Sequence, residues 1–129
     1  MKLAICNEVF EGWDFARTAD YVARAGYDAI EIAPFTLAPV VTDISKAERT
    51  RIRTVAEHAG IEIAGIHWVL AKTEGFHITH PDESVRVRTA RYCQELVRFC
   101  ADIGGRIVVL GSPKQRNKLR GVTNALAQS

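Results

Sequence analysis

Three times along this chain, an amphipathic segment with helical spacing is followed by glycine and then by a short apolar run. The glycines and the runs that follow them are Gly26 with 27–33, Gly60 with 61–68, and Gly104–Gly105 with 106–110. Glycine commonly ends a helix because it adopts left-handed backbone angles without strain. Helices that alternate with short apolar strands form a parallel sheet with right-handed crossovers. The repeat therefore predicts an α/β fold.

Capping residues indicate where the helices begin. Asp14 is suited to cap a helix that runs to Ala25. Ser45 and Glu48 match the S-x-x-E capping box at the start of a second helix. Residues 81–84, Pro-Asp-Glu-Ser, open the longest helix. Each predicted helix thus has a start signal as well as a glycine stop.

A first strand at 2–7 completes the predicted order βαβαβαβ, and a weak helical tail follows from about Arg120. The runs 61–66 and 106–110 are almost continuously apolar, as is typical of parallel strands covered on both faces. No low-complexity linker divides the chain, so we expect a single domain over 1–129.

The length suits half of a (β/α)8 barrel, because a complete barrel takes about 250 residues. A four-stranded flavodoxin-like sheet is the alternative. A half barrel leaves its first and last strands unpaired, and such edges favour a homodimer.

Composition limits the function classes. Of 129 residues, 47% are apolar and 25% charged, as in a soluble globular protein. The net charge of +2 does not favour nucleic acid, and we interpret the basic residues from Lys114 to Arg120 as a solvated surface. The N-terminus resembles neither a signal peptide nor a membrane span. Three cysteines without CxxC spacing fit a reduced, cytoplasmic setting.

Ligands of parallel α/β folds bind at the C-terminal ends of the strands, where four groups are predicted to lie: Asn7 and Glu8, Glu31 and Pro34, His67 and Trp68, and residues 111–117. Glu31 could bind substrate or act as a general base, or it could pair with a cation inside the fold. His67 could be a base, a metal ligand or a donor to sugar hydroxyls, or a hydrogen-bonded core residue. Trp68 could stack on a sugar ring or cap the core.

Two loops carry further polar residues. Residues 111–117, Gly-Ser-Pro-Lys-Gln-Arg-Asn, offer backbone N–H groups, the Ser112 hydroxyl and the charges of Lys114 and Arg116 to a phosphate or polyol. The run is not a P-loop, because GxxxxGK[ST] is absent. His77 and His80 form an H-x-x-H pair, but without an evident carboxylate partner this spacing favours a surface loop over a metal site.

The runs AGYDAIEI, GIHW and VVLGSPKQRN together resemble the sugar phosphate isomerase/epimerase group of the xylose-isomerase-like TIM-barrel superfamily. The resemblance extends over about 2–117 and corresponds to strands one to four of the barrel. It implies an enzyme that uses a divalent metal (Mn, Mg, Co or Zn) and moves a proton beside a carbonyl through an enediolate. Its substrate would be a small sugar or sugar phosphate.

The same resemblance places the metal ligands and the acid/base pair on strands five to eight. We therefore expect no catalytic residue and no complete metal site in this chain, with His67 as a weak candidate ligand. What carries over is substrate lining: Glu31, His67, Trp68, Ser112, Lys114 and Arg116.

From these expectations we interpret the chain as the N-terminal half of a sugar isomerase/epimerase that is inactive alone, either a fragment or the product of a truncated reading frame. The alternative is a stand-alone ligand-binding or dimerising half barrel. An abasic-site endonuclease-like nucleic-acid binder is less favoured, because strand four ends in Gly111–Ser112 where that group has a histidine.

Overall fold

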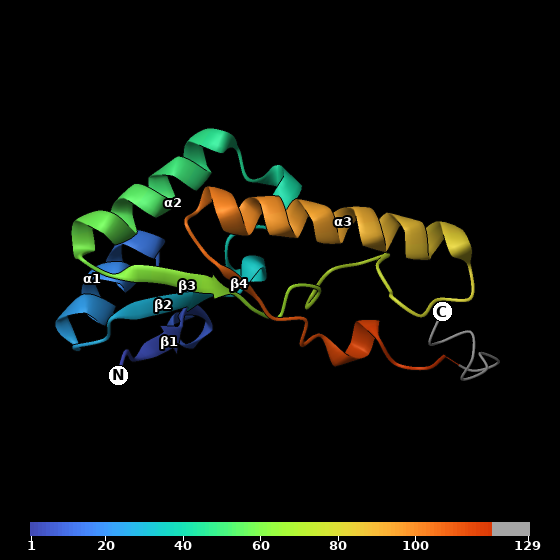
Figure 1. The fold of residues 1–129 in the computed structure, drawn as a ribbon, viewed down its shortest axis with the longest axis horizontal. Helices are drawn as coiled ribbons and strands as arrows, with labels where there is room; N and C mark the ends of the chain where they lie inside the picture. Colours follow the sequence, from blue (N-terminus) through green and yellow to red (C-terminus); the bar gives the residue numbers. More distant parts are fainter. Residues whose placement is uncertain (120–129) are drawn as a thin grey trace.

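The computed structural model describes residues 1–119, in which four parallel strands form one sheet in the order β1-β2-β3-β4 (Figure 1). The elements, in chain order, are β1 (Ala4–Cys6), α1 (Phe15–Arg24), β2 (Ala29–Ile32), α2 (Lys46–Ala59), β3 (Glu62–Ile66), α3 (Glu83–Asp102) and β4 (Ile107–Val108). The predicted parallel βαβαβαβ order is confirmed, and each strand is shorter than the run that predicted it. The predicted helical tail from about Arg120 lies outside the described residues.

The predicted caps form at both ends of α2. Ser45 Oγ accepts a hydrogen bond from the Glu48 backbone N–H at 3.1 Å, and Gly60 ends the helix with φ +77°. The Glu48 carboxylate accepts from Arg51, the residue one turn further along. The first turn of α1 is similarly capped by Asp14, which accepts from the Arg17 N–H at 3.1 Å.

The helices cover one face of the sheet. In Figure 1, α2 and α3 lie above the strands, whereas the chain after β4 continues to the right, beneath α3. The core between sheet and helices is apolar, and its fully buried members include Ile30, Ile32, Ile52, Leu96 and Phe99. Burial of this surface is the main favourable contribution to folding.

The edge strand β4 and the two residues after it are exposed. Ile107, Val108, Val109 and Leu110 have exposed fractions between 39% and 55%. The expectation that this apolar run is covered on both faces is therefore wrong for the described residues. Because β4 pairs with β3 on one side, its other edge remains open within this part of the chain.

The register between β2 and β3 shifts by one residue. Ile30 pairs with Ile63 in parallel alignment. The next residue, Glu31, pairs with Gly65, so Ala64 is an extra residue in β3. This irregularity is a β-bulge, and an extra residue moves the side chains that follow it to the opposite face.

The bulge decides on which face of the sheet the side chains at the end of β3 lie. Ile63 and Ile66 both lie in the helix-covered core although three positions separate them, a spacing that regular strand alternation does not allow. His67, two residues beyond Gly65, then falls on the face that carries Glu31. The bulge therefore brings His67 and Glu31 to the same side of the sheet.

Within residues 1–119, the structure contains no helix with the length and apolar character needed to cross a membrane.

Gly65 allows β4 to approach β3 closely. A Cβ atom at this position would lie 2.0 Å from the Ile107 carbonyl oxygen, a backbone atom that cannot move without displacing β4. We predict that Gly65→Ala lowers the free energy of unfolding by about 1–3 kcal/mol, the usual cost of overpacking. Chemical denaturation would measure the loss.

The matched control is Gly111→Ala, because nothing lies within 4 Å of the Cβ it adds. Equal unfolding free energies for the two variants would contradict the close approach at Gly65.

Candidate functional site

The C-terminal ends of β1, β2 and β3 bring Cys6, Glu31 and His67 together. Cys6 Sγ donates to Glu31 Oε2 at 3.3 Å, and His67 Nδ1 lies 3.2 Å from the same oxygen. Glu8 approaches from the turn after β1, with Oε1 3.7 Å from His67 Nε2. Two carboxylates therefore flank one imidazole at the strand ends.

Sheet pairing explains this meeting. Cys6 and Glu31 are direct partners in the β1–β2 register. The His67 backbone N–H donates to the Ile32 carbonyl at 3.0 Å, so β3 stays attached to β2 for one residue beyond Ile66. Three neighbouring parallel strands thus each contribute one side chain to the same edge.

The chain turns sharply after His67. Trp68 has φ +54° and Lys72 has φ +58°, left-handed values that are uncommon for residues other than glycine. Such conformations cost free energy and are frequent at functional sites. Trp68 is 44% exposed after this turn, so the stacking role predicted for it is sterically open.

His67 is buried, with 5% of its surface exposed, and neither ring nitrogen has a hydrogen-bond partner among the described residues. Its Nδ1 lies 3.2 Å from Glu31 Oε2, but the pair lacks the geometry of a hydrogen bond. Buried polar atoms are nearly always paired, since an unpaired one costs free energy. His67 is therefore a buried polar side chain of this site whose two ring nitrogens are free of hydrogen bonds to the described residues.

The Cys6 thiol holds its proton strongly. Burial, the hydrogen bond to Glu31 and the negative charges of Glu31 and Glu8 raise its pKa to about 11. The thiol is consequently neutral near physiological pH and donates to the Glu31 carboxylate.

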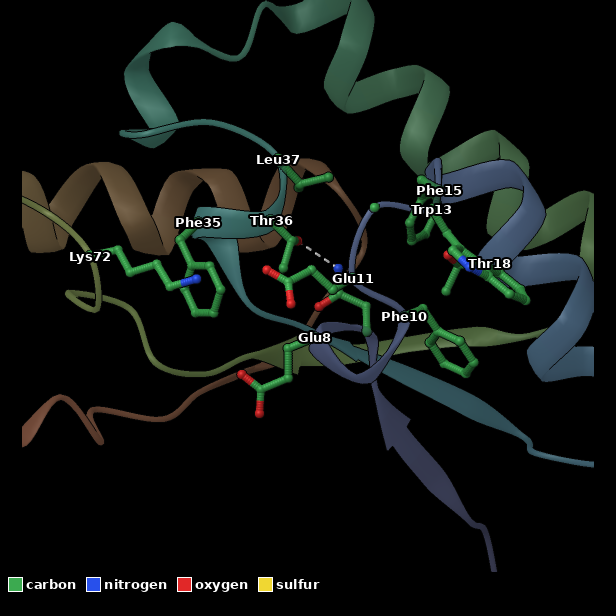
Figure 2. Close-up of a pocket in the computed structure, with 12 residues that line it drawn as sticks. Glu8, Phe10, Glu11, Trp13, Phe15, Thr18, Phe35, Thr36, Leu37 and Lys72 are labelled. Atoms are coloured by element: carbon green, nitrogen blue, oxygen red, sulfur yellow. Dashed lines mark hydrogen bonds between the residues drawn. The ribbon is translucent and has the colours of Figure 1, made fainter.

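A pocket of about 410 Å³ adjoins this cluster, with Glu8 in its wall (Figure 2). Figure 2 shows Lys72 and Phe35 at one end of the pocket and the rings of Phe10 and Trp13 at the other. Lys72 Nζ lies 4.4 Å from the centre of the Phe35 ring, a cation–π contact.

Asn7 holds the pocket wall in place. Its side chain accepts from the Ala33 N–H at 2.8 Å and donates to Thr36 Oγ1 at 2.7 Å. Because both bonds run from the end of β1 to the chain after β2, they fix Glu8 relative to Phe35.

The residues after β4 that were predicted to bind substrate lie outside this cluster. Ser112 is buried, with 1% exposed, and its Oγ accepts from the Leu70 N–H at 2.9 Å, so its hydroxyl braces the loop after β3. Lys114 lies in the short 3-10 helix Pro113–Gln115, and Arg116 directly follows this helix. Both side chains are exposed. The structure gives no contact between these three residues and Glu31 or His67, and substrate binding by them stays a prediction.

The His77–His80 loop has local structural contacts. The His77 N–H donates to Thr89 Oγ1 at 2.9 Å, and His80 Nδ1 accepts from the Asp82 N–H at 3.1 Å. Burial, and then the nearby His80, lower the pKa of His77. These bonds attach the loop to the start of α3, in keeping with the surface-loop interpretation.

Sequence reasoning missed Cys6. Its only signal was its place at the end of the first predicted strand, where an apolar core role for cysteine is the ordinary expectation. Trp13 and Lys72 were also missed as pocket residues, because they come from loops whose course the sequence does not specify.

Comparison with known proteins agrees with this architecture. The sequence matches the family model "Xylose isomerase-like TIM barrel" over residues 19–128. The chain belongs to this family. A search of curated protein sequences gives no significant match.

Two solved structures share the fold of this chain. One is a D-psicose 3-epimerase crystallised in the presence of D-fructose, with a TM-score of 0.73 and 20% identity over 98% of this chain and 43% of that one. The other is D-psicose 3-epimerase from Clostridium cellulolyticum H10 with D-tagatose, with a TM-score of 0.69 and 18% identity over 84% and 36% of the two chains. This chain therefore spans less than half the length of either enzyme.

The side chains at these strand ends also form a group that could hold a metal ion. Cys6, Glu31 and His67 each offer one donor atom, and the three atoms lie within 4.8 Å of one another. The unpartnered His67 nitrogens fit a ligand role. A thiol, an imidazole and a carboxylate suit zinc or cobalt better than magnesium or manganese, which prefer oxygen ligands.

Burial raises the pKa of Cys6 most and Glu31 adds to it, which yields a pH prediction. Only the thiolate is alkylated, so Cys6 should react with iodoacetamide very slowly near neutral pH and faster as the pH rises toward 11. Glu31→Gln removes a negative charge, which lowers the pKa of the thiol. Each unit of that fall raises the thiolate fraction at pH 9 about tenfold.

Mass spectrometry of the alkylated protein would give both rates. Cys93 is the internal control, because it lies on α3 and its pKa is raised by burial alone. Unchanged Cys6 labelling in Glu31→Gln would contradict the coupling.

Proposed function

We propose that this chain supplies the substrate-binding side of a sugar isomerase/epimerase site, with a small ketose or its phosphate as the ligand. The observation that carries the proposal is the convergence of Glu31 and His67 at the strand ends, where this fold binds ligands. The D-psicose 3-epimerases with the same fold, crystallised with D-fructose and D-tagatose, support a sugar as the ligand class.

Each group of the cluster has a role in this proposal. The Glu31 carboxylate accepts hydrogen bonds from sugar hydroxyls, and the buried imidazole of His67 donates or accepts a further one. Trp68, exposed beside them, offers a ring face to the apolar side of the sugar. The adjacent pocket leaves room for the rest of the ligand.

The chemistry we propose is proton transfer at the carbon next to a carbonyl. A bound divalent metal would polarise that carbonyl. The residues of this chain bind and orient the sugar in a site that is partly shielded from water. We do not assign to them the proton exchange with carbon, so we expect no turnover of sugar by this chain alone.

Sugar binding tests the proposal directly. We predict that D-fructose or D-tagatose binds to the purified chain in a calorimetric or NMR titration. Glu31→Gln should weaken the binding about tenfold or more, because a hydrogen bond to a charged group is worth about 1.5–3 kcal/mol. Glu95→Gln is the matched control, because Glu95 lies on α3 outside the cluster and its side chain is 34% exposed, similar to that of Glu31.

No saturable binding of either sugar, or equal affinities in the two glutamine variants, would overturn the proposed ligand class.

The loop after β4 provides a test of whether the sugar ligand carries a phosphate. If Lys114 and Arg116 contact the ligand, replacing both by alanine should weaken binding of a ketose phosphate and leave the affinity for the free ketose unchanged, since these cations are worth most against a phosphate. The same titration measures both affinities. An equal loss for both ligands would show that the two side chains do not select phosphate.

A second function, self-association, is favoured by the exposed apolar edge at Ile107, Val108, Val109 and Leu110. We propose that a second copy of the chain covers it. Four strands from each copy give the eight of a closed barrel, and a two-fold axis along the barrel keeps all of them parallel. The open edge of β4 in one copy would then pair with β1 of the other.

Analytical ultracentrifugation tests this association. We expect a dimer, and we expect Val108→Lys to shift it to monomer because a lysine charge blocks edge pairing. Val97→Lys on α3, where the valine is also exposed, is the matched control and should remain dimeric. A monomer throughout the micromolar range would sink the proposal.

A further inference from the structure

The cluster at the ends of β1, β2 and β3 has the donor set of a transition-metal site. Its three donor atoms, Cys6 Sγ, Glu31 Oε2 and His67 Nδ1, are of the types that bind zinc in proteins. Magnesium and calcium prefer sites built from oxygen alone. The presence of sulfur and nitrogen in one cluster therefore selects for a softer metal.

The distances suit one ion bound by all three residues. Glu31 Oε2 lies 3.3 Å from Cys6 Sγ and 3.2 Å from His67 Nδ1. With zinc–sulfur bonds of about 2.3 Å and zinc–nitrogen and zinc–oxygen bonds of about 2.0–2.2 Å, tetrahedral ligands lie about 3.4–3.6 Å apart. These two pairs of atoms need to separate by only a few tenths of an ångström, and the third pair, Cys6 Sγ and His67 Nδ1, lies within 4.8 Å and must reach the same spacing.

His67 supplies an independent observation. The side chain is 7% exposed, yet both ring nitrogens lack a hydrogen-bond partner in the described residues. A metal bound at Nδ1 satisfies one of them. The other, Nε2, faces the Glu8 carboxylate at 3.7 Å, which matches the common arrangement of a carboxylate behind a metal-bound histidine.

Solvent can reach the cluster. The Glu31 side chain is 28% exposed and that of Glu8 is 34% exposed, so an ion has a path to the buried nitrogen and thiol. Three protein ligands also leave a fourth position open for water or another ligand, as in catalytic zinc sites.

From these contacts we propose that Cys6, Glu31 and His67 bind one zinc or cobalt ion, with Glu8 as the positioning residue behind His67, and that the Cys6 thiol releases its proton to solvent as the ion binds. The site lies on strands one to three, whereas the resemblance places the ligands of the isomerase/epimerase metal on strands five to eight. It goes beyond the proposed function and needs no sugar, so failure of the sugar titrations would leave it standing.

Cobalt titration of the metal-free full chain tests the site, because cobalt replaces zinc and its bond to a thiolate absorbs in the near ultraviolet. We expect one ion per chain and a thiolate absorption band, and zinc should displace the cobalt. Cys6→Ser should remove the band, and His67→Asn should lower the affinity for the ion more than tenfold. Glu8→Gln should weaken metal binding about 10–100-fold, the usual effect of losing such a partner.

Cys93→Ser and His80→Asn are the matched controls, since both residues lie outside the cluster and should leave the band unchanged. Circular dichroism spectra should show that each variant keeps its helices. If a variant fails to fold, X-ray absorption of the zinc-loaded unmutated protein provides the second test, with one sulfur and otherwise nitrogen or oxygen ligands expected.

Three outcomes would overturn the site: no cobalt bound by the folded chain, a band that survives Cys6→Ser, or zinc without a sulfur ligand.

Discussion

The parallel pairing of β2 with both of its neighbours is the constraint on which the site depends. Cys6 lies opposite Glu31 because β1 and β2 run in direct register. Ala64 is an extra residue between the pairs that β2 makes with β3, so His67 falls on the same face as Glu31. A one-residue change in this register would send the imidazole to the helix-covered face. The positions of the side chains that form the site therefore depend directly on strand register.

Close backbone approach supports the same arrangement. Gly65 sits at the bulge, and its lack of a side chain lets the Ile107 carbonyl come near. This position serves both sides of β3, because Gly65 pairs with Glu31 on one side and with Ile107 on the other. The residue that makes room for β4 is thus part of the irregularity that orients His67.

Polar groups at the strand ends are not uniformly satisfied. Asn7 and Ser112 are buried and hold loops in place, since each side chain is hydrogen-bonded to backbone or side-chain partners. His67 is equally buried but has no such bonds. This contrast separates residues that maintain the fold from one that is available to a ligand, and sequence position alone does not make the distinction.

The sequence by itself determined the order of the elements, the caps at Asp14, Ser45 and Gly60, and the family, because these depend on local propensity and on short runs of residues. It also placed Glu31 and His67 at strand ends. Only the tertiary structure decided that Cys6 joins them, that Ser112 braces a loop, and that β4 is exposed. Those outcomes depend on strand register, on a bulge and on loop course, which are set by packing between segments far apart in the chain.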